Sequence, residues 1–268
     1  MTIYCYDPAP ENKKPILLLH GLGADGRSWG FQTTALVNAG FRPVAPDLPG
    51  FGKSSANGMH WDISNISQLI LDWMQRMFQT PVPVVGISMG GVVALQMTLT
   101  RPALIKQLVL ANTFACLRPH SFHGMSYLVK RFILATIRGS ASQANMVAYH
   151  LFPNPDQADL RRAITELILE SDPRVYRKAM RGLALFDVRN RLNEINIPTL
   201  IISGELDTTV PLEIQDELAL GIKGSQHVII PGARHAVTAD QADRFNEAML
   251  GFLQPAGEAK FPQTPQSG

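Results

Sequence analysis

Residues 84–95 read Val84-Val85-Gly86-Ile87-Ser88-Met89-Gly90-Gly91-Val92-Val93-Ala94-Leu95, a β-branched run and an apolar run joined at a serine. The first run is typical of the end of a buried strand, and the second continues at helical spacing to Leu99. The five residues from Gly86 to Gly90 must therefore turn the chain from strand to helix. We predict a tight turn with Ser88 at its tip.

The glycines of this turn indicate a reactive role for Ser88. A residue at so sharp a tip has a strained backbone, and glycines two residues before and after it let strand and helix approach closely. A serine hydroxyl is a weak nucleophile at neutral pH and needs a base and a charge stabiliser nearby. The Met89 N–H, at the start of the helix, is placed to stabilise an oxyanion. A plain glycine-rich turn is the alternative interpretation of the pentapeptide.

The composition is that of a compact globular protein of the size of an enzyme. Of the 268 residues 46% are hydrophobic and 17% charged, with a net charge of +2, so the chain can bury a sizeable core. So small a charge, without basic runs, argues against a nucleic-acid partner. Cys5 and Cys116 fit a reducing compartment. No signal peptide and no run near the roughly 20 residues that cross a bilayer is visible, so we expect no membrane segment and a cytoplasmic location.

Strand-length apolar runs alternate with helical patterns along most of the chain, which predicts an α/β fold with a mainly parallel, doubly wound sheet. The predicted strands are Thr2–Tyr6, Pro15–Leu19, Arg42–Pro46, Pro83–Val85, Gln107–Ala111, Pro198–Gly204 and His227–Ile230. The predicted helices include Trp29–Ala39, Ile63–Phe78, whose Trp73 and methionines we expect in the core, and Thr238–Leu253.

The chain divides by composition into a core, an insertion and a tail. Residues 118–191 lack strand patterns, contain about four helical segments and carry twelve Lys and Arg against six Asp and Glu. We expect them to form a helical cap over the carboxyl ends of the strands, where open α/β sheets bind ligands. The core would comprise 1–117 and 192–254. The Pro/Gln/Gly-rich residues 255–268 have little to bury, so we expect disorder there.

Three residue types needed for nucleophilic catalysis each follow a predicted strand: Ser88, Asp207 and His235. The carboxyl ends of parallel strands meet at one edge of a sheet, so these residues can converge. His235 would take the Ser88 proton, and a buried carboxylate would orient the imidazole. Glu205 competes with Asp207 for the acid role, and the residues alone leave that choice open.

Position distinguishes His235 from the other six histidines. His20 adjoins the loop His20-Gly21-Leu22-Gly23, whose Leu22 N–H we assign as a second oxyanion donor, and we interpret His20 as bracing that loop. An ordinary strand-to-helix loop is the alternative. Asp47 opens a Pro/Gly-rich turn before the nucleophile, which favours a structural role. The remaining histidines fall in loops, in the cap or at a strand start: His60, His120, His123, His150 and His227.

Taken together, these motifs resemble those of the α/β-hydrolases. They are His20–Gly23, Asp47–Ser54, Gly86–Gly91, Gly204–Asp207 and His235, and their order covers Pro15 to Leu253. The resemblance implies an α/β-hydrolase fold with a helical cap inserted between strands 6 and 7, and it favours Asp207 over Glu205. Leu110–Thr113, the Ser88 turn and Phe245-Asn246 are similar to the 3-oxoadipate enol-lactonases and carboxylesterases.

The function we expect is hydrolysis of carboxylic esters, lactones included, of small to medium, partly hydrophobic acyl groups through an acyl-enzyme on Ser88. Trp29, Phe114 and Met125 are candidate pocket residues. No cluster has metal-ligand spacing and no phosphate-binding glycine motif occurs, so we expect no metal or other cofactor and a small-molecule partner only. The oligomeric state is left open. The alternatives are an enol-lactonase-like enzyme, acyl transfer, or a slow-turnover signalling receptor, which a turnover assay would distinguish.

Overall fold

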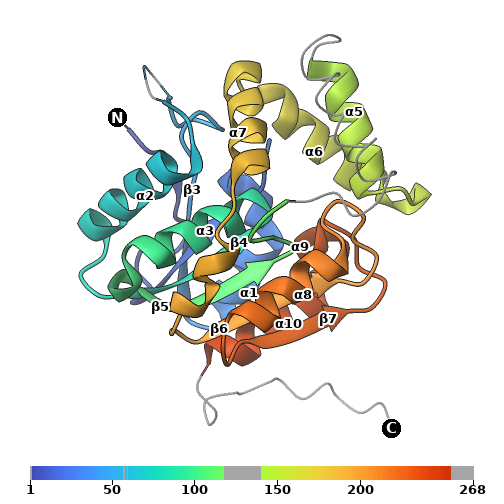
Figure 1. Ribbon diagram of the computed structural model, residues 1–268. Coiled ribbons are helices and arrows are strands. Elements are labelled where there is room, and N and C mark those ends of the chain that lie inside the picture. The colour runs from blue at the N-terminus through green and yellow to red at the C-terminus, as the bar shows by residue number, and fades with distance from the viewer. Residues whose placement is uncertain (1, 57, 59, 118–139, 255–268) are drawn as a thin grey trace, which may run out of the picture.

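The computed structural model describes residues 2–56, 58, 60–117 and 140–254 (Figure 1). In these ranges one seven-stranded sheet has the order β1-β3-β2-β4-β5-β6-β7. Its strands are β1 (Cys5–Tyr6), β2 (Lys14–Leu19), β3 (Phe41–Pro46), β4 (Val82–Ile87), β5 (Ile105–Ala111), β6 (Thr199–Gly204) and β7 (Gln226–Ile230). Neighbouring strands are parallel except for β1, which pairs antiparallel with β3. The predicted mainly parallel sheet is confirmed.

Two apolar clusters lie on opposite faces of this sheet because strand residues alternate between them. In β2, Leu17 and Leu19 belong to one cluster, whereas Ile16 and Leu18 belong to the other. All four side chains are fully buried. A strand covered on both faces needs an unbroken apolar run, which is what the sequence has at this point.

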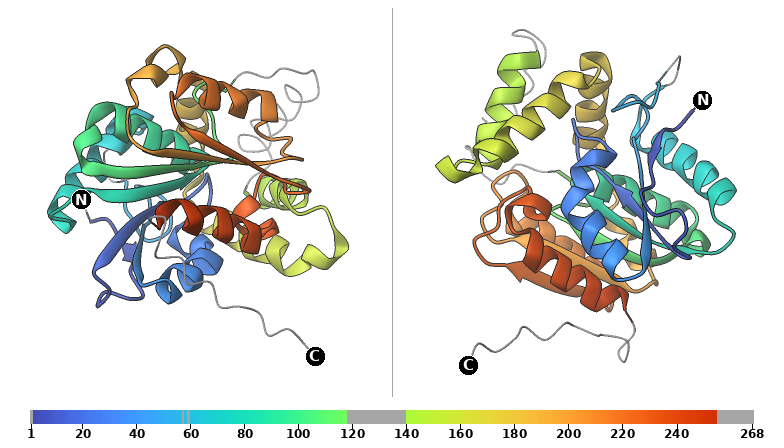
Figure 2. Two further views of the ribbon diagram at one scale, coloured as in Figure 1. Left: turned by 90° about the horizontal axis from the view of Figure 1, so that it is seen from below. Right: turned by 180° about the vertical axis from the view of Figure 1, so that it is seen from behind.

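Helices cover both faces of the sheet, as the view from below shows (Figure 2, left). One face carries α2 (Ile63–Met77), α3 (Met89–Thr100) and α8 (Leu212–Gly221), and the other carries α1 (Gly30–Asn38) and α10 (Ala242–Leu253). Short helical turns complete the core: η1 (Gly26–Trp29), η2 (Pro102–Leu104), η5 (Arg189–Glu194) and α9 (Val237–Asp240). Within the described ranges, none of these helices is both long and apolar enough to cross a membrane.

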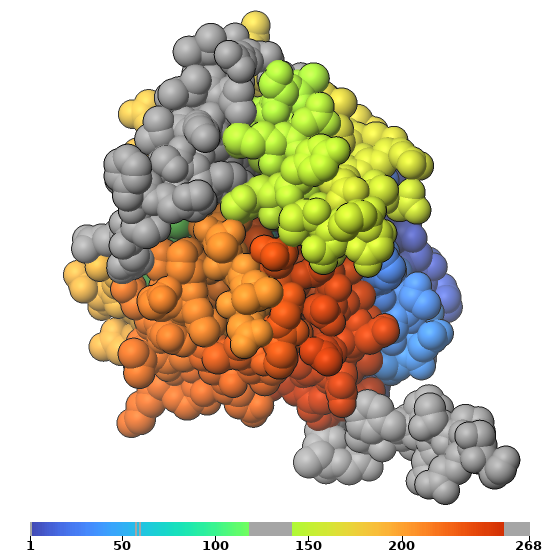
Figure 3. Space-filling view, turned by 90° about the vertical axis from the view of Figure 1, so that its right-hand side faces the viewer, coloured from blue at the N-terminus to red at the C-terminus, as the bar shows by residue number. Residues whose placement is uncertain are grey.

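Three further helices, which we call the cap helices, follow β5 and precede β6: α5 (Ser140–Leu151), α6 (Ala158–Glu170) and α7 (Pro173–Leu185), with the short η4 (Pro155–Gln157) between α5 and α6. They lie beyond the carboxyl ends of the strands, and α5 and α6 rest on the carboxy-terminal part of the core (Figures 1 and 3). The insertion lies between β5 and β6 of this sheet. The family pattern numbers these strands 6 and 7. The numbers differ because the described amino-terminal region has one strand fewer than that pattern. Residues 118–139 of the predicted cap and the whole predicted tail, 255–268, lie outside the described residues.

Two details of the predicted helices were wrong. Met74 is buried as expected, but the side chain of Met77, in the last turn of α2, is 41% exposed. The helix predicted over Thr238–Leu253 is broken at Gln241, whose backbone is not helical (φ −134°, ψ 53°). The Asp240 carboxylate accepts a hydrogen bond from the Arg234 N–H at 2.8 Å, so this turn is used to hold the preceding loop.

At Gly90 the helix α3 approaches the sheet so closely that a side chain has no room. A methyl group on Gly90 would collide with the Leu19 carbonyl oxygen of β2, so we expect Gly90→Ala to lower the free energy of unfolding by about 3 kcal/mol. Urea unfolding measures this. The control is Gly251→Ala in α10, where nothing lies within 4 Å and the helix should gain about 0.5–1 kcal/mol. Equal effects of the two substitutions would contradict the packing described here.

Candidate active site

The backbone of Ser88 is held in a conformation that few non-glycine residues adopt, with φ 53° and ψ −117° at the junction of β4 and α3. Two hydrogen bonds fix it there. The Ser88 N–H donates to the Ala111 carbonyl at 2.9 Å, and the Thr113 hydroxyl donates to the Ser88 carbonyl at 2.8 Å. Neighbouring β5 therefore pins the turn, and the Ser88 side chain projects from its tip into a cavity.

Asn112 connects the three loops that meet at this edge. It is buried and has a left-handed backbone (φ 42°), which asparagine tolerates better than most residues. Its side-chain amide donates to the carbonyls of Arg234 and His235, at 2.8 and 2.7 Å. Its side-chain oxygen accepts from the Gly204 N–H at 2.7 Å. No role for Asn112 was predicted from the sequence, although an asparagine directly after a buried strand is a signal for such a turn.

The Asp207 carboxylate is buried at the start of the loop after β6. One oxygen, Oδ1, accepts hydrogen bonds from the N–H groups of Thr209 and Val210, at 2.8 and 3.0 Å. The other, Oδ2, lies 2.7 Å from Nδ1 of His235. The Asp207 side chain is 0% exposed and that of His235 is 12% exposed. These donors satisfy the hydrogen-bonding capacity of the buried carboxylate oxygens.

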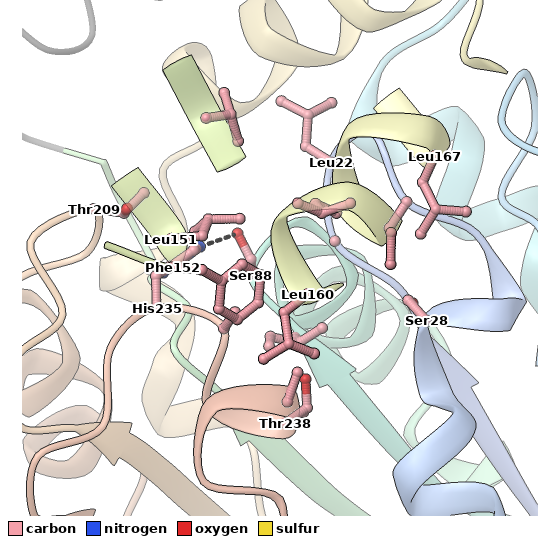
Figure 4. Close-up of a pocket in the computed structure, with 18 of the residues that line it drawn as sticks. Leu22, Ser28, Ser88, Leu151, Phe152, Leu160, Leu167, Thr209, His235 and Thr238 are labelled. Atoms are coloured by element: carbon pink, nitrogen blue, oxygen red, sulfur yellow. Dashed lines mark hydrogen bonds between the residues drawn. The ribbon is translucent and has the colours of Figure 1, made fainter. Parts of the chain in front are cut away.

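Ser88, His235 and Asp207 form one continuous hydrogen-bonded line. The carboxylate only accepts, so Nδ1 of His235 carries the proton and Nε2 has a free lone pair. That Nε2 lies 3.0 Å from the Ser88 Oγ (Figure 4). Glu205, the competing acid, instead accepts a hydrogen bond from the Gly232 N–H at 2.8 Å. The arrangement can therefore draw the proton from the serine hydroxyl onto His235.

The loop after β2 lies beside Ser88 and is braced by His20. Nε2 of the buried His20 accepts from the Leu48 N–H at 2.9 Å, so its proton is on Nδ1, which donates to the Gly21 carbonyl at 2.9 Å. Burial lowers the pKa of His20 below its usual value, so the ring is neutral. A methyl group on Gly21 would lie 3.7 Å from the Ser88 Cβ, which places the backbone of this loop next to the nucleophile candidate.

Asp47 has the structural role expected for it. Its carboxylate accepts from the N–H groups of Gly26 and Lys53, at 2.9 and 2.8 Å. It thereby joins the loop after β3 to the start of η1.

A cavity of about 810 Å³ opens above Ser88 and His235, between the core and the cap helices. Its wall is mostly apolar and includes Phe114, Leu151, Phe152, Leu160, Ile164 and Leu167. Figure 4 shows Leu167 on the side away from His235, with Leu160 between them in this view. A space of this size and character suits a small organic molecule with an apolar body.

The candidate pocket residues have different outcomes. Phe114 lines the cavity as expected. Trp29 was a wrong prediction: it is 1% exposed, packs in the core cluster against α1 and does not line the cavity, whereas its neighbours Ser28, Gly30 and Phe31 do. The turn η1 precedes α1 and rotates Trp29 away from the cavity. Met125 lies outside the described residues.

Charge is sparse on the described cavity wall. Apart from His235, the titratable lining residues are Arg27 and Glu166. The Arg27 guanidinium is engaged by two carboxylates, Asp25 and Glu170, which raise its pKa above the usual value. Within the described residues no three His, Cys, Asp or Glu side chains are grouped to hold a metal ion. His235 is therefore the one titratable residue of the described wall that also contacts Ser88.

A sequence profile described as the alpha/beta hydrolase family matches residues 16–248, a range that includes every loop of this site. The chain belongs to the alpha/beta hydrolase family. This confirms the resemblance seen in the sequence. The matched range contains strands β3 to β7 and the loops at the carboxyl edge of the sheet.

Relatives of this hydrolase have names that refer to several reactions. A protein named carbamate hydrolase RutD from Klebsiella pneumoniae is 31% identical over 92% of this chain and 94% of its own. One named non-heme chloroperoxidase from Synechocystis sp. is 31% identical over 90% and 91% of the two chains.

Two solved structures show the shared fold. An esterase from Exiguobacterium antarcticum has a TM-score of 0.87 at 23% identity, covering 94% of this hydrolase and 96% of that chain. An enol-lactonase from Burkholderia xenovorans has a TM-score of 0.84 at 24% identity, with the same coverage.

The neutral, buried His20 predicts a pH dependence of stability for this hydrolase. Its pKa is lowered by folding, so below about pH 6.5 the unfolded chain takes up a proton that the folded chain does not. The contribution of His20 to the free energy of unfolding is fully present above that pH. As the pH decreases below it, this contribution falls by up to about 1.4 kcal/mol per pH unit. Urea unfolding of wild type and His20→Gln between pH 5 and 7.5 measures the difference, which should shrink on acidification. Parallel curves would contradict a neutral His20.

Proposed function

We propose that this hydrolase cleaves carboxylic esters, lactones included, of small to medium, partly hydrophobic acyl groups through an acyl-enzyme on Ser88. The observation that carries the proposal is the line of two hydrogen bonds, Ser88 Oγ to His235 Nε2 at 3.0 Å and His235 Nδ1 to Asp207 Oδ2 at 2.7 Å, at the floor of an apolar cavity. A serine so paired with an oriented imidazole is an activated nucleophile.

In the proposed reaction the Ser88 oxygen attacks the ester carbonyl carbon while its proton passes to His235 Nε2. The tetrahedral intermediate collapses as His235 returns that proton to the departing alkoxide, which leaves as an alcohol. Water then donates a proton to His235 and attacks the acyl-enzyme, and collapse of the second intermediate releases the acid and restores the Ser88 hydroxyl. Asp207 stabilises the imidazolium in both steps.

The oxyanion is assigned to the N–H groups of Leu22 and Met89. Met89 is the first residue of α3, where N–H groups lack helical partners. Leu22 lines the cavity directly after Gly21, the neighbour of Ser88. Each such donor is worth about 3 kcal/mol of barrier lowering in comparable sites.

The cavity wall supports a neutral acyl group. Arg27 already has Asp25 and Glu170 as partners, and Glu166 adds a further negative charge to the wall. A substrate carboxylate would therefore find no uncompensated cation on the described wall. Its desolvation would have no offset. Neutral esters and lactones are accordingly favoured over substrates that carry an additional carboxylate.

The nucleophile is tested with Ser88→Ala, which removes the attacking oxygen. We expect turnover of p-nitrophenyl butyrate to fall by roughly ten-thousandfold or more, and covalent labelling by a fluorophosphonate probe to disappear. Ser225→Ala, whose hydroxyl bonds the Ala219 carbonyl far from the line of three residues, is the matched control and should keep both signals. Labelling that survives Ser88→Ala would place the nucleophile elsewhere. A wild-type protein that neither hydrolyses the ester nor reacts with the probe would contradict the proposed function.

The acyl preference is tested with two ester series. For neutral p-nitrophenyl esters from acetate to hexanoate we expect kcat/KM to rise by up to about fourfold for each added methylene, since burying one methylene contributes about 0.8 kcal/mol. An ester of equal length with a terminal carboxylate should react at least about tenfold more slowly than its neutral counterpart. A preference for the carboxylate series would favour an enol-lactonase-like enzyme instead.

A further inference from the structure

Behind Asp207, on the side away from the cavity, a second line of buried polar side chains runs toward the protein surface. It begins at Gln215 in α8, continues to Ser203 in β6 and ends at His227 in β7. Gln215 and Ser203 are fully buried, and the His227 side chain is 17% exposed. None of these three side chains lines the cavity. Buried polar groups without a role in packing need an account of their hydrogen bonds.

The Gln215 side chain has all of its hydrogen-bonding groups engaged. Its nitrogen donates to the Val210 carbonyl at 2.8 Å and, over a longer 3.4 Å, to Asp207 Oδ2. Its oxygen accepts from the Ser203 hydroxyl at 2.7 Å. The reverse orientation of the amide would set its oxygen against two acceptors, so the neighbours determine which way Gln215 points.

Gln215 contacts the Asp207 loop on the side away from the cavity. The Val210 N–H already donates to Asp207 Oδ1, and the Val210 carbonyl accepts from Gln215. Gln215 thus holds both the carboxylate and Val210, whose N–H binds that carboxylate. The carboxylate oxygen that Gln215 approaches, Oδ2, is the one bonded to His235.

Ser203 and His227 set the orientation of Gln215. The single hydroxyl proton of Ser203 goes to Gln215, so the Ser203 oxygen must accept from His227 Nε2, 2.8 Å away. The other ring nitrogen, Nδ1, faces Asp216 Oδ1 at 3.6 Å. Every donor from His227 to Asp207 therefore points in one direction, toward the carboxylate.

We propose that Gln215 is a positioning residue for the Asp207 carboxylate, and that Ser203 and His227 hold Gln215 in its working orientation. The inference rests on the proposed function, since it assigns a role behind the same Ser88-His235-Asp207 line. Gln215 fixes the position at which Oδ2 meets the imidazole, and its N–H donates to this carboxylate oxygen. Loss of Gln215 lets the carboxylate rotate, and the imidazolium formed during the reaction is then stabilised less well.

The main test compares Gln215→Leu and Ser203→Ala with Ser67→Ala. Ser67 is a fully buried serine in α2 that bonds the Val93 carbonyl, so Ser67→Ala matches Ser203→Ala in chemistry and burial without touching this line. With p-nitrophenyl butyrate we expect kcat to fall by about tenfold for Gln215→Leu and less for Ser203→Ala, as for loss of a hydrogen bond to a charged group. KM should be unchanged because neither residue lines the cavity. Ser67→Ala should keep wild-type kcat.

A second test separates positioning from general destabilisation. When Asp207 is replaced by Ala, Gln215 has no carboxylate to position, so adding Gln215→Leu to Asp207→Ala should not slow fluorophosphonate labelling of Ser88 further. In the wild-type background Gln215→Leu should slow it by about tenfold. An equal loss in both backgrounds would overturn the proposal.

The outer end of the line gives a test that does not disturb the core. His227→Gln keeps an N–H donor for Ser203, whereas His227→Leu does not. We expect His227→Leu to lower kcat by about twofold or more and His227→Gln to keep it. If Gln215→Leu, Ser203→Ala and His227→Leu all match Ser67→Ala while wild type hydrolyses esters, the positioning role is wrong and the proposed function stands. If wild type does not react at all, the proposed function itself fails.

Discussion

The arrangement of the site depends on how closely the first turn of α3 approaches β2 and β4. At Gly86 and Gly90 the helix backbone comes so near the strands that a methyl group does not fit, and Ser88 between them is bent into a left-handed conformation. Hydrogen bonds from Ser88 to Ala111 and from Thr113 to Ser88 hold this bend against its strain. The rigid sheet therefore carries the nucleophile candidate, and the loops bearing His235 and Asp207 have only to reach it.

Polar and apolar groups are divided sharply around the imidazole. In front of His235 the cavity wall is mostly apolar and includes several leucines and phenylalanines. Behind it stand Asp207 and the side chain of Gln215, both buried and hydrogen-bonded. In the proposed reaction, an ion pair formed at His235 would be solvated by fixed protein dipoles on one side and would face a low-dielectric space on the other. Electrostatic stabilisation at such a site needs little reorganisation of its surroundings.

The sheet, its helices and the convergence of Ser88, Asp207 and His235 could be predicted because they follow from local patterns. Apolar runs mark strands buried on both faces, and glycines two residues either side of a serine mark the sharp turn. What failed depends on contacts between distant segments. Trp29 and Phe31 are only two residues apart, and the short turn η1 before α1, in which Trp29 lies, decides which of the two faces the cavity. The roles of Asn112 and Gln215 are not visible in the sequence, because their partners lie in β6 and in the loops after β6 and β7.

Helix α7 belongs to the cap by sequence position but to the core by packing. Its Val175 and Tyr176 fit against Gly50 and Gly23, where the glycines leave no room for a side chain, and its buried residues join the apolar cluster on one face of the sheet. Residues 140–185 are consequently not an interchangeable module. A chimaera that grafts a cap from a relative onto this scaffold would have to transplant the complementary glycine loops with it.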